Sequence, residues 1–148
     1  MRGFKVVSKY QGQMINLPRR HSKDSAGYDF EAAVDIEIKA NQKIPVLIPT
    51  GVKVYMEQNE FLLLVNRSGT PRKKGLVMPN GVGIIDSDYY DNPSNEGEIF
   101  MQVINISDQD VTIKKGERIG QGIFLPFLKT EDDQVLGQRI GGFGSSGD

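Results

Sequence analysis

Short stretches in which apolar and polar residues alternate dominate this chain. Val34, Ile36 and Ile38 alternate with Asp35 and Glu37, and similar stretches recur further along the sequence. A period of two indicates strands that bury one face, whereas no window of about 11–18 residues keeps the period of an amphipathic helix. The strands predicted from alternation or from apolar runs are 34–38, 52–56, 61–65, 99–104, 111–113 and 119–127.

Two of the apolar runs, 61–65 and 99–104, are nearly continuous and predict strands buried on both faces. Only residues 70–74, with Pro71 early in the segment, favour a short helical turn. Residues typical of turns separate the apolar runs, at 48–51, 79–81, 91–95 and 114–117. The pattern predicts an all-β fold, a jelly-roll-like barrel or sandwich, without internal repeat or interdomain linker.

The composition narrows the class of protein further. The 148 residues include 17 glycines, more than the usual share of roughly 7%. The absence of cysteine excludes a disulfide scaffold, a cysteine-based zinc site and a thiol nucleophile. With 38% hydrophobic and 25% charged residues, the chain has the composition of one globular domain.

The charge is almost balanced, with 18 Lys and Arg against 19 Asp and Glu. A protein that coats long nucleic acids is expected to be strongly basic, so this balance argues against one but leaves small anions such as nucleotides open. No apolar run approaches the roughly 20 residues of a membrane span, and Met1–Lys5 is not followed by the apolar region of a signal peptide. A cytoplasmic protein without membrane contact is the expectation.

The C-terminal residues 137–148 differ in composition from the β domain predicted over residues 1–136. Glycine and serine prevail after Arg139, and Phe143 is the single aromatic residue among them. Such a segment is either a frayed terminus or a flexible arm. An arm of this composition suits a nucleotide, because exposed peptide N–H groups and hydroxyls bind phosphate and an aromatic ring stacks on a base.

Two further segments contain residues that suit phosphate chemistry. Arg67, Ser68 and Gly69 follow the strand predicted at 61–65, where charge and backbone donors can bind phosphate, although an ordinary strand end has the same composition. Residues 72–74 are a short basic run that we expect at the solvated surface.

Asp86 follows an apolar pair, so we expect its carboxylate at the edge of the core, where partial burial favours a general base. If the strand continues, Asp86 and Asp88 share one face and could hold a metal ion. A turn that closes a hairpin is the alternative.

Three other polar positions allow weaker conclusions. Asp29 follows Ala26 and Gly27 in a segment that could also open an edge strand, and Gln121 lies on the strand predicted at 119–127. His21 is the only histidine, which excludes a histidine-based metal site and gives no basis for a Ser/His/Asp triad, so we expect it at the surface.

Taken together and in this order, five segments resemble the five motifs of the trimeric dUTPase family, from about Leu17 to Gly147. The match is specific because all five occur at family-like spacing. The segments are 25–29 (SAGYD), 67–69 (RSG), 80–89 (NGVGIIDSDY), 116–121 (GERIGQ) and Arg139 with 141–147 (GGFGSSG).

The resemblance implies hydrolysis of dUTP to dUMP and pyrophosphate, which lowers dUTP and supplies dUMP for thymidylate synthesis. Asp86 would be the general base for water that attacks the α-phosphorus, Ser68 would lie near the leaving oxygen, and Gln121 would donate near the α-phosphate. Mg²⁺ would be held mainly by substrate phosphates and waters, with Asp29 ordering those waters.

The resemblance also implies how the substrate is bound and selected. The hairpin at 80–89 would accept uracil and exclude thymine and cytosine, while Tyr89 would pack under the deoxyribose and exclude a 2′-hydroxyl. Phe143 would cover the base, and Arg139 with two serines would hold the β- and γ-phosphates. The implied binding residues are Arg67, Ser68, Gly69, Asn80, Gly83, Ile85, Asp86, Tyr89, Gln121, Arg139, Phe143, Gly144, Ser145 and Ser146.

The family assembles as homotrimers with sites between subunits, which the C-terminal arm closes. The chain departs from the usual motifs at three places: Asn66 replaces a common proline, 91–96 is a six-residue insertion, and the spacing between Arg139 and Phe143 is one residue shorter. A dCTP deaminase-type relative remains an alternative, as does a dUTPase fold with an added regulatory protein-binding role served by the insertion.

Overall fold

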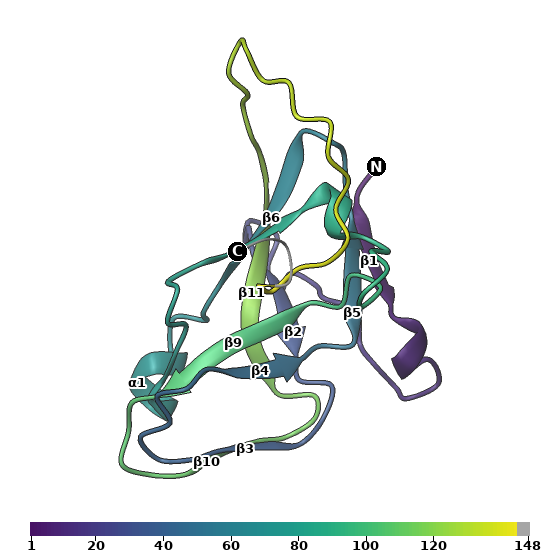
Figure 1. Cartoon of the computed structure of the whole chain (residues 1–148). Helices are drawn as coiled ribbons and strands as arrows, with labels where there is room; N and C mark the ends of the chain where they lie inside the picture. The colour runs from purple at the N-terminus through teal and green to yellow at the C-terminus, as the bar shows by residue number, and fades with distance from the viewer. Residues whose placement is uncertain (145–148) are drawn as a thin grey trace.

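A computed structural model describes residues 1–144 as an all-β fold (Figure 1). Residues 1–144 form one short helix, α1 (Thr70–Lys74), and 3-10 turns at Ser8–Tyr10 and Ser87–Tyr89. No helix in residues 1–144 is long and apolar enough to cross a membrane. The strands are β1 (Gly3–Val6), β2 (Tyr28–Glu31), β3 (Ile36–Ile38), β4 (Val46–Pro49), β5 (Val52–Tyr55), β6 (Glu60–Val65), β7 (Leu76–Val77), β8 (Gly83–Asp86), β9 (Phe100–Asn105), β10 (Val111–Ile113) and β11 (Arg118–Pro126).

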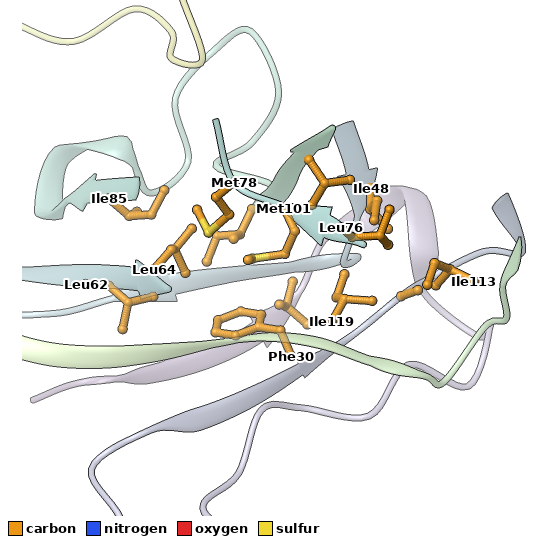
Figure 2. Packing of buried hydrophobic residues seen from close by; sticks show 14 of the residues in the cluster. Phe30, Ile48, Leu62, Leu64, Leu76, Met78, Ile85, Met101, Ile113 and Ile119 are labelled. Carbon is orange, nitrogen blue, oxygen red and sulfur yellow. The ribbon is translucent and has the colours of Figure 1, made fainter. Parts of the chain in front are cut away.

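The strands form two larger antiparallel sheets and two strand pairs. The larger sheets have the orders β2-β11-β6-β8 and β4-β9-β7, and the pairs are β1-β5 and β10-β3. Figure 2 shows the core between the larger sheets, where Phe30 and Leu64 of one meet Met101 and Leu76 of the other. These four side chains are buried completely or almost so. The fold is therefore the predicted jelly-roll-like sandwich, with its core between sheets.

The two continuous apolar runs form β6 and β9, but the prediction that both faces of these strands are buried is wrong for this chain. Burial alternates along both strands. Leu62 and Leu64 are buried, whereas Phe61, Leu63 and Val65 keep intermediate exposure. Successive side chains point to opposite faces of a sheet, and only one face of each strand lies against the core.

The predicted helical turn at 70–74 is confirmed as α1. Pro71 lies in its first turn, where a missing backbone N–H costs nothing. The helix ends at Gly75, whose φ of 66° is left-handed and whose N–H bonds the Pro71 carbonyl.

The chain after β11 leaves the body of the molecule. It rises above the sheets and turns back, as the yellow segment in Figure 1 shows. Its apolar side chains are strongly exposed, with Val135 at 81% and Leu136 at 95%. This segment therefore adds little to the core, and it brings Arg139 and Phe143 back to the region around β8.

Candidate functional site

A cationic pocket of about 580 Å³ lies where β2, β11 and the end of β6 meet α1. We call it the cationic pocket. Arg67, Ser68 and Gly69 line it together with Gln121 and Asp29, so the structure brings three of the five motifs together. Its other lining residues are His21, Ser25, Gly27, Thr70, Arg72, Lys73, Lys74 and Arg118.

Asp29 is the carboxylate at the centre of the cationic pocket. Its oxygens lie 3.4 Å from Arg67 Nε, 3.4 Å from Arg118 Nη1 and 3.3 Å from His21 Nε2. The Asp29 side chain is only 14% exposed. His21 was expected at the surface and is 43% exposed, but it also contacts this carboxylate. Asp29 therefore holds cationic groups on the wall of the pocket.

Gln121 is positioned by its neighbours on both sides of β11. It is paired with Asp29 on β2 and with Val65 on β6, and its Nε2 donates to the Asn66 carbonyl over 3.3 Å. A Cβ at Gly27 would lie 2.0 Å from Gln121 Oε1, so a larger residue at 27 would displace the amide from this position. The Asn66 Oδ1 atom is buried without a hydrogen-bond partner among the described residues.

The basic run 72–74 was expected at the solvated surface, and the structure confirms this for Arg72 and Lys73 while all three residues line the cationic pocket. Lys74 is less exposed and pairs with Glu117. Burial lowers the pKa of Lys74, and the nearby charge of Arg67 lowers it further. The run therefore adds positive charge to one wall of the pocket.

A second, more apolar hollow of about 420 Å³ lies along β8, and we call it the β8 cleft. β8 is one of the two edge strands of its sheet in the described part of the chain, so the peptide groups on its outer side pair with no other strand there. The β8 cleft is lined by Leu64, Met78, Asn80, Gly83, Ile84, Ile85, Asp86, Tyr89, Phe100, Gln102, Arg139, Gly142, Phe143 and Gly144.

Asp86 lies at the end of β8, and its side chain is 48% exposed. The strand does not continue, because residues 87–89 form a 3-10 turn. Arg139 Nη2 contacts Asp86 Oδ2, and Arg139 Nε donates to Asp88 Oδ1 over 2.7 Å. Both carboxylates thus meet one guanidinium here, and the residues described contain no group of three or more metal-ligating side chains.

Tyr89 forms part of the cleft wall and is almost completely buried. Its hydroxyl donates to the Glu98 carbonyl over 2.6 Å and accepts a hydrogen bond from Asn95 Nδ2 over 2.8 Å. Burial raises the pKa of Tyr89 to about 12, so the hydroxyl stays protonated at physiological pH. The side chain is held by its far end, which leaves the ring to line the cleft.

The C-terminal segment packs onto this cleft. The Phe143 ring lies 5.9 Å from that of Tyr89 and 5.4 Å from that of Phe100, both in edge-to-face arrangements. A Cβ at Gly142 would lie 2.4 Å from Tyr89 Cε2, so glycine permits this close approach. Ser145 and Ser146 lie outside the described residues.

Asp86, at one end of the β8 cleft, and Arg67, in the cationic pocket, lie toward opposite ends of β6, although the cleft itself reaches along β8 as far as Gly83 and Leu64. Asp86 is paired with Phe61, whereas Arg67 follows the other end of the strand. Six residues at about 3.3 Å each separate these points by about 20 Å. The five motifs thus form two separate groups within one chain.

Three residues of these sites were not singled out from the sequence. Arg118 lies within a recognised motif, but only the fold shows that it faces Asp29. Phe100 enters the β8 cleft from β9 of the other sheet. Asn95 belongs to the insertion and contacts Tyr89, a pairing for which its local sequence gives no signal.

Comparison with known proteins identifies the family. The dUTPase family model matches residues 13–147. The deoxyuridine 5′-triphosphate nucleotidohydrolase of Lactococcus lactis is 52% identical over 99% of this chain and 98% of its own length. The crystal structure of the dUTPase from Streptococcus mutans has a TM-score of 0.82 and 50% identity, over 87% of this chain and 98% of that one.

A more distant structure shares the fold. The dUTPase of phage phi11 of S. aureus is 21% identical with a TM-score of 0.72, over 93% of this chain and 97% of that one, and coordinates a structural Mg(II) ion in a mutant form. From the family match over nearly its whole length and from the relative that is 52% identical, this chain belongs to the dUTPase family.

Proposed function

We propose that this chain hydrolyses dUTP to dUMP and pyrophosphate. Water attacks the α-phosphorus, the bond from that phosphorus to the bridging oxygen breaks, and pyrophosphate leaves. The Asp86 carboxylate takes up the proton of the water. The observation that carries the proposal is that a member of the dUTPase family has two hollows of different chemistry. The β8 cleft combines an edge strand with a carboxylate, and the separate cationic pocket gathers positive charge.

The β8 cleft is proposed to select the base and the sugar. Peptide donors and acceptors along the outer edge of β8 suit the edge of uracil, with Asn80, Gly83 and Ile85 around it. A cytosine would leave some of these buried groups unpaired, which is a strong form of discrimination. The Tyr89 ring would pack under the deoxyribose, and Phe143 would cover the base.

The cationic pocket is proposed to bind the phosphates. Arg67 supplies charge, the Ser68 hydroxyl lies near the leaving oxygen, and the Gly69 backbone and Gln121 amide donate hydrogen bonds. Arg139, with Gly144 and the serines at 145 and 146, would bind the β- and γ-phosphates. Because Arg139 contacts Asp86 here, this role requires the guanidinium to leave the carboxylate.

The residues of the cationic pocket fit a magnesium ion that is held mainly by substrate phosphates and water. Asp29 is the only carboxylate among the described lining residues, and its oxygens face cationic groups, so the pocket has no ligand set of its own. Asp29 would order waters bound to the ion. When bound, Mg²⁺ would neutralise phosphate charge.

A homotrimer with sites between subunits is proposed from the separation along β6. With Asp86 and Arg67 about 20 Å apart in one chain, their side chains cannot meet at one triphosphate. Two neighbouring chains that present opposite ends of β6 would bring them together. The C-terminal arm, residues 137–148 beside a β domain at 1–136, would close the site. A cytoplasmic location, where dUMP serves thymidylate synthesis, stays a prediction.

The experiment that tests this function measures pyrophosphate release from dUTP, dTTP, dCTP and UTP in the presence of Mg²⁺. We expect turnover of dUTP and at least about a hundredfold lower kcat/KM for the other three. Comparable hydrolysis of all four would contradict the selectivity. Ammonia release from dCTP would identify a deaminase instead.

A further inference from the structure

The insertion at 91–96 is tied firmly to the body of the protein. Lys53 on β5 contacts the carboxylates of Asp91 and Glu96, and its Nζ lies 2.6 Å from Glu96 Oε1. The Asp91 N–H donates to the Glu96 carbonyl over 3.2 Å, which closes the loop at its base. Lys53 is buried, although it lies on a strand in which polar and apolar residues alternate. The insertion is therefore an ordered part of the structure.

The interior of the loop is built from two asparagines. Asn92 is buried, and its Oδ1 accepts from the backbone N–H groups of Ser94 and Asn95 and from the Ser94 hydroxyl. Its Nδ2 donates to Asn95 Oδ1 over 2.8 Å, and that oxygen also accepts the Gly97 N–H over 3.0 Å. These bonds fix the orientation of the Asn95 side chain.

Both asparagines hold Tyr89. Asn92 Nδ2 donates to the Tyr89 carbonyl over 2.8 Å, and Asn95 Nδ2 donates to the Tyr89 hydroxyl over 2.8 Å. The hydroxyl in turn donates to the Glu98 carbonyl. The phenol oxygen thus has a donor and an acceptor partner, so rotation or displacement of the ring breaks at least one hydrogen bond.

We infer that Asn95 is a positioning residue that fixes the Tyr89 ring and thereby sets discrimination against a 2′-hydroxyl. The inference rests on the proposed function, in which the Tyr89 ring packs under the sugar. A Tyr89 ring that is fixed in place excludes the 2′-hydroxyl of a ribose, because the ring cannot shift without strain. A ring that has lost a hydrogen bond can move aside and admit the hydroxyl. The insertion would thus serve sugar selectivity.

The test is the ratio of kcat/KM for dUTP to kcat/KM for UTP in Asn95→Ala. We expect the ratio to fall about fivefold or more, which is the effect of losing one buried hydrogen bond. The fall should come mainly from a higher kcat/KM for UTP. Ser94→Ala is the matched control: it removes a bond from the same loop but no contact with Tyr89. An unchanged ratio in Asn95→Ala, or an equal fall in Ser94→Ala, would overturn the inference.

Tyr89→Phe keeps the test decisive if Asn95→Ala folds poorly. Removing the hydroxyl should itself lower the dUTP/UTP ratio, and adding Asn95→Ala to Tyr89→Phe should lower it no further, because the two groups act through one bond. Additive effects would contradict the inference. Equal loss of activity toward both nucleotides would show a structural role only. Failure of the wild-type protein to hydrolyse dUTP would instead refute the proposed function.

Discussion

At the scale of single residues, an acidic side chain at the end of the insertion, Glu96, and one just after it, Glu98, have opposite electrostatic surroundings. Glu98 is 3% exposed, and burial raises the pKa of its carboxyl. Glu96 is hydrogen-bonded to Lys53, which lowers the pKa of its carboxyl. Ionisation of Glu98 at neutral pH therefore destabilises the fold, whereas ionisation of Glu96 stabilises it.

We predict that Glu98→Gln raises the melting temperature at pH 7 by at least about 2 °C. The raised pKa means that the protonated form is favoured in the folded state, so the contribution of Glu98 to stability is present below its unfolded pKa and is lost as the pH rises through the folded pKa. The gain from Glu98→Gln should consequently vanish as the pH falls toward about 4.5. Thermal denaturation between pH 4 and 8 measures it.

The control for this prediction is Glu96→Gln, which should have the opposite sign. Because the folded pKa of Glu96 is lowered, its contribution is present above the unfolded pKa and is lost as the pH falls through the folded pKa. Glu96→Gln should thus destabilise the protein at pH 7 and have little effect at low pH. Parallel behaviour of the two variants would argue against this assignment.

At the scale of elements, the C-terminal arm contributes contacts to a site rather than to the core. Apolar side chains before it are strongly exposed, and its described contacts include those of Arg139 with two carboxylates and of Phe143 with Tyr89 and Phe100. Its removal should accordingly separate activity from stability.

We predict that deletion of residues 137–148 lowers kcat/KM for dUTP by about a hundredfold or more, because closure and phosphate contacts are lost. The melting temperature should change by less than about 2 °C. Phe143→Ala should reduce activity measurably, whereas Val135→Ala, at a position that is 81% exposed, should not. A large fall in melting temperature on deletion would show that the arm is part of the folded core.

The elements also show what the sequence could reveal. Alternation located β3, β5 and β10, and the longer apolar runs gave β6, β9 and β11, because burial with a period of two is a local signal. The burial of Lys53 was missed, since its carboxylate partners lie about forty residues further along the chain. Tertiary pairing of this kind leaves no trace in a local window.

The candidate site was predictable to a similar extent. Asp86, Tyr89, Arg67 and Gln121 belong to contiguous motifs, so their residue types could be recognised one segment at a time. Their division between two hollows depends on strand order and on the length of β6, which are properties of the whole fold. The contact of Asn95 with Tyr89 depends on the path of the inserted loop.

At the scale of the whole molecule, a site shared between chains predicts complementation between inactive variants. Asp86→Asn removes the base, and Ser68→Ala removes a phosphate contact, so each variant alone should lose about a hundredfold or more in kcat. Co-expression of the two should restore about a third of the wild-type activity in trimers that contain both variants, because one of the three interfaces in each such trimer joins two intact halves.

The two variants carry different tags, and assemblies that contain both are purified through the two tags in turn. Steady-state dUTP turnover is then measured. Light scattering should give a mass three times that of one chain. Variants mixed after purification without subunit exchange provide the control and should stay inactive. Absence of activity in the co-expressed assemblies would place the whole site within one chain.

The length of β6 has a consequence for how such an enzyme would respond to its own concentration. Because β6 holds Asp86 and Arg67 about 20 Å apart, a single chain would carry two incomplete halves of a site, each of which needs a different partner. Turnover per chain would then fall on dilution as assemblies dissociate, and substrate that bridges two chains would oppose that loss by mass action. A strand that separates the two halves of the site would thus make catalysis depend on the concentration of the protein.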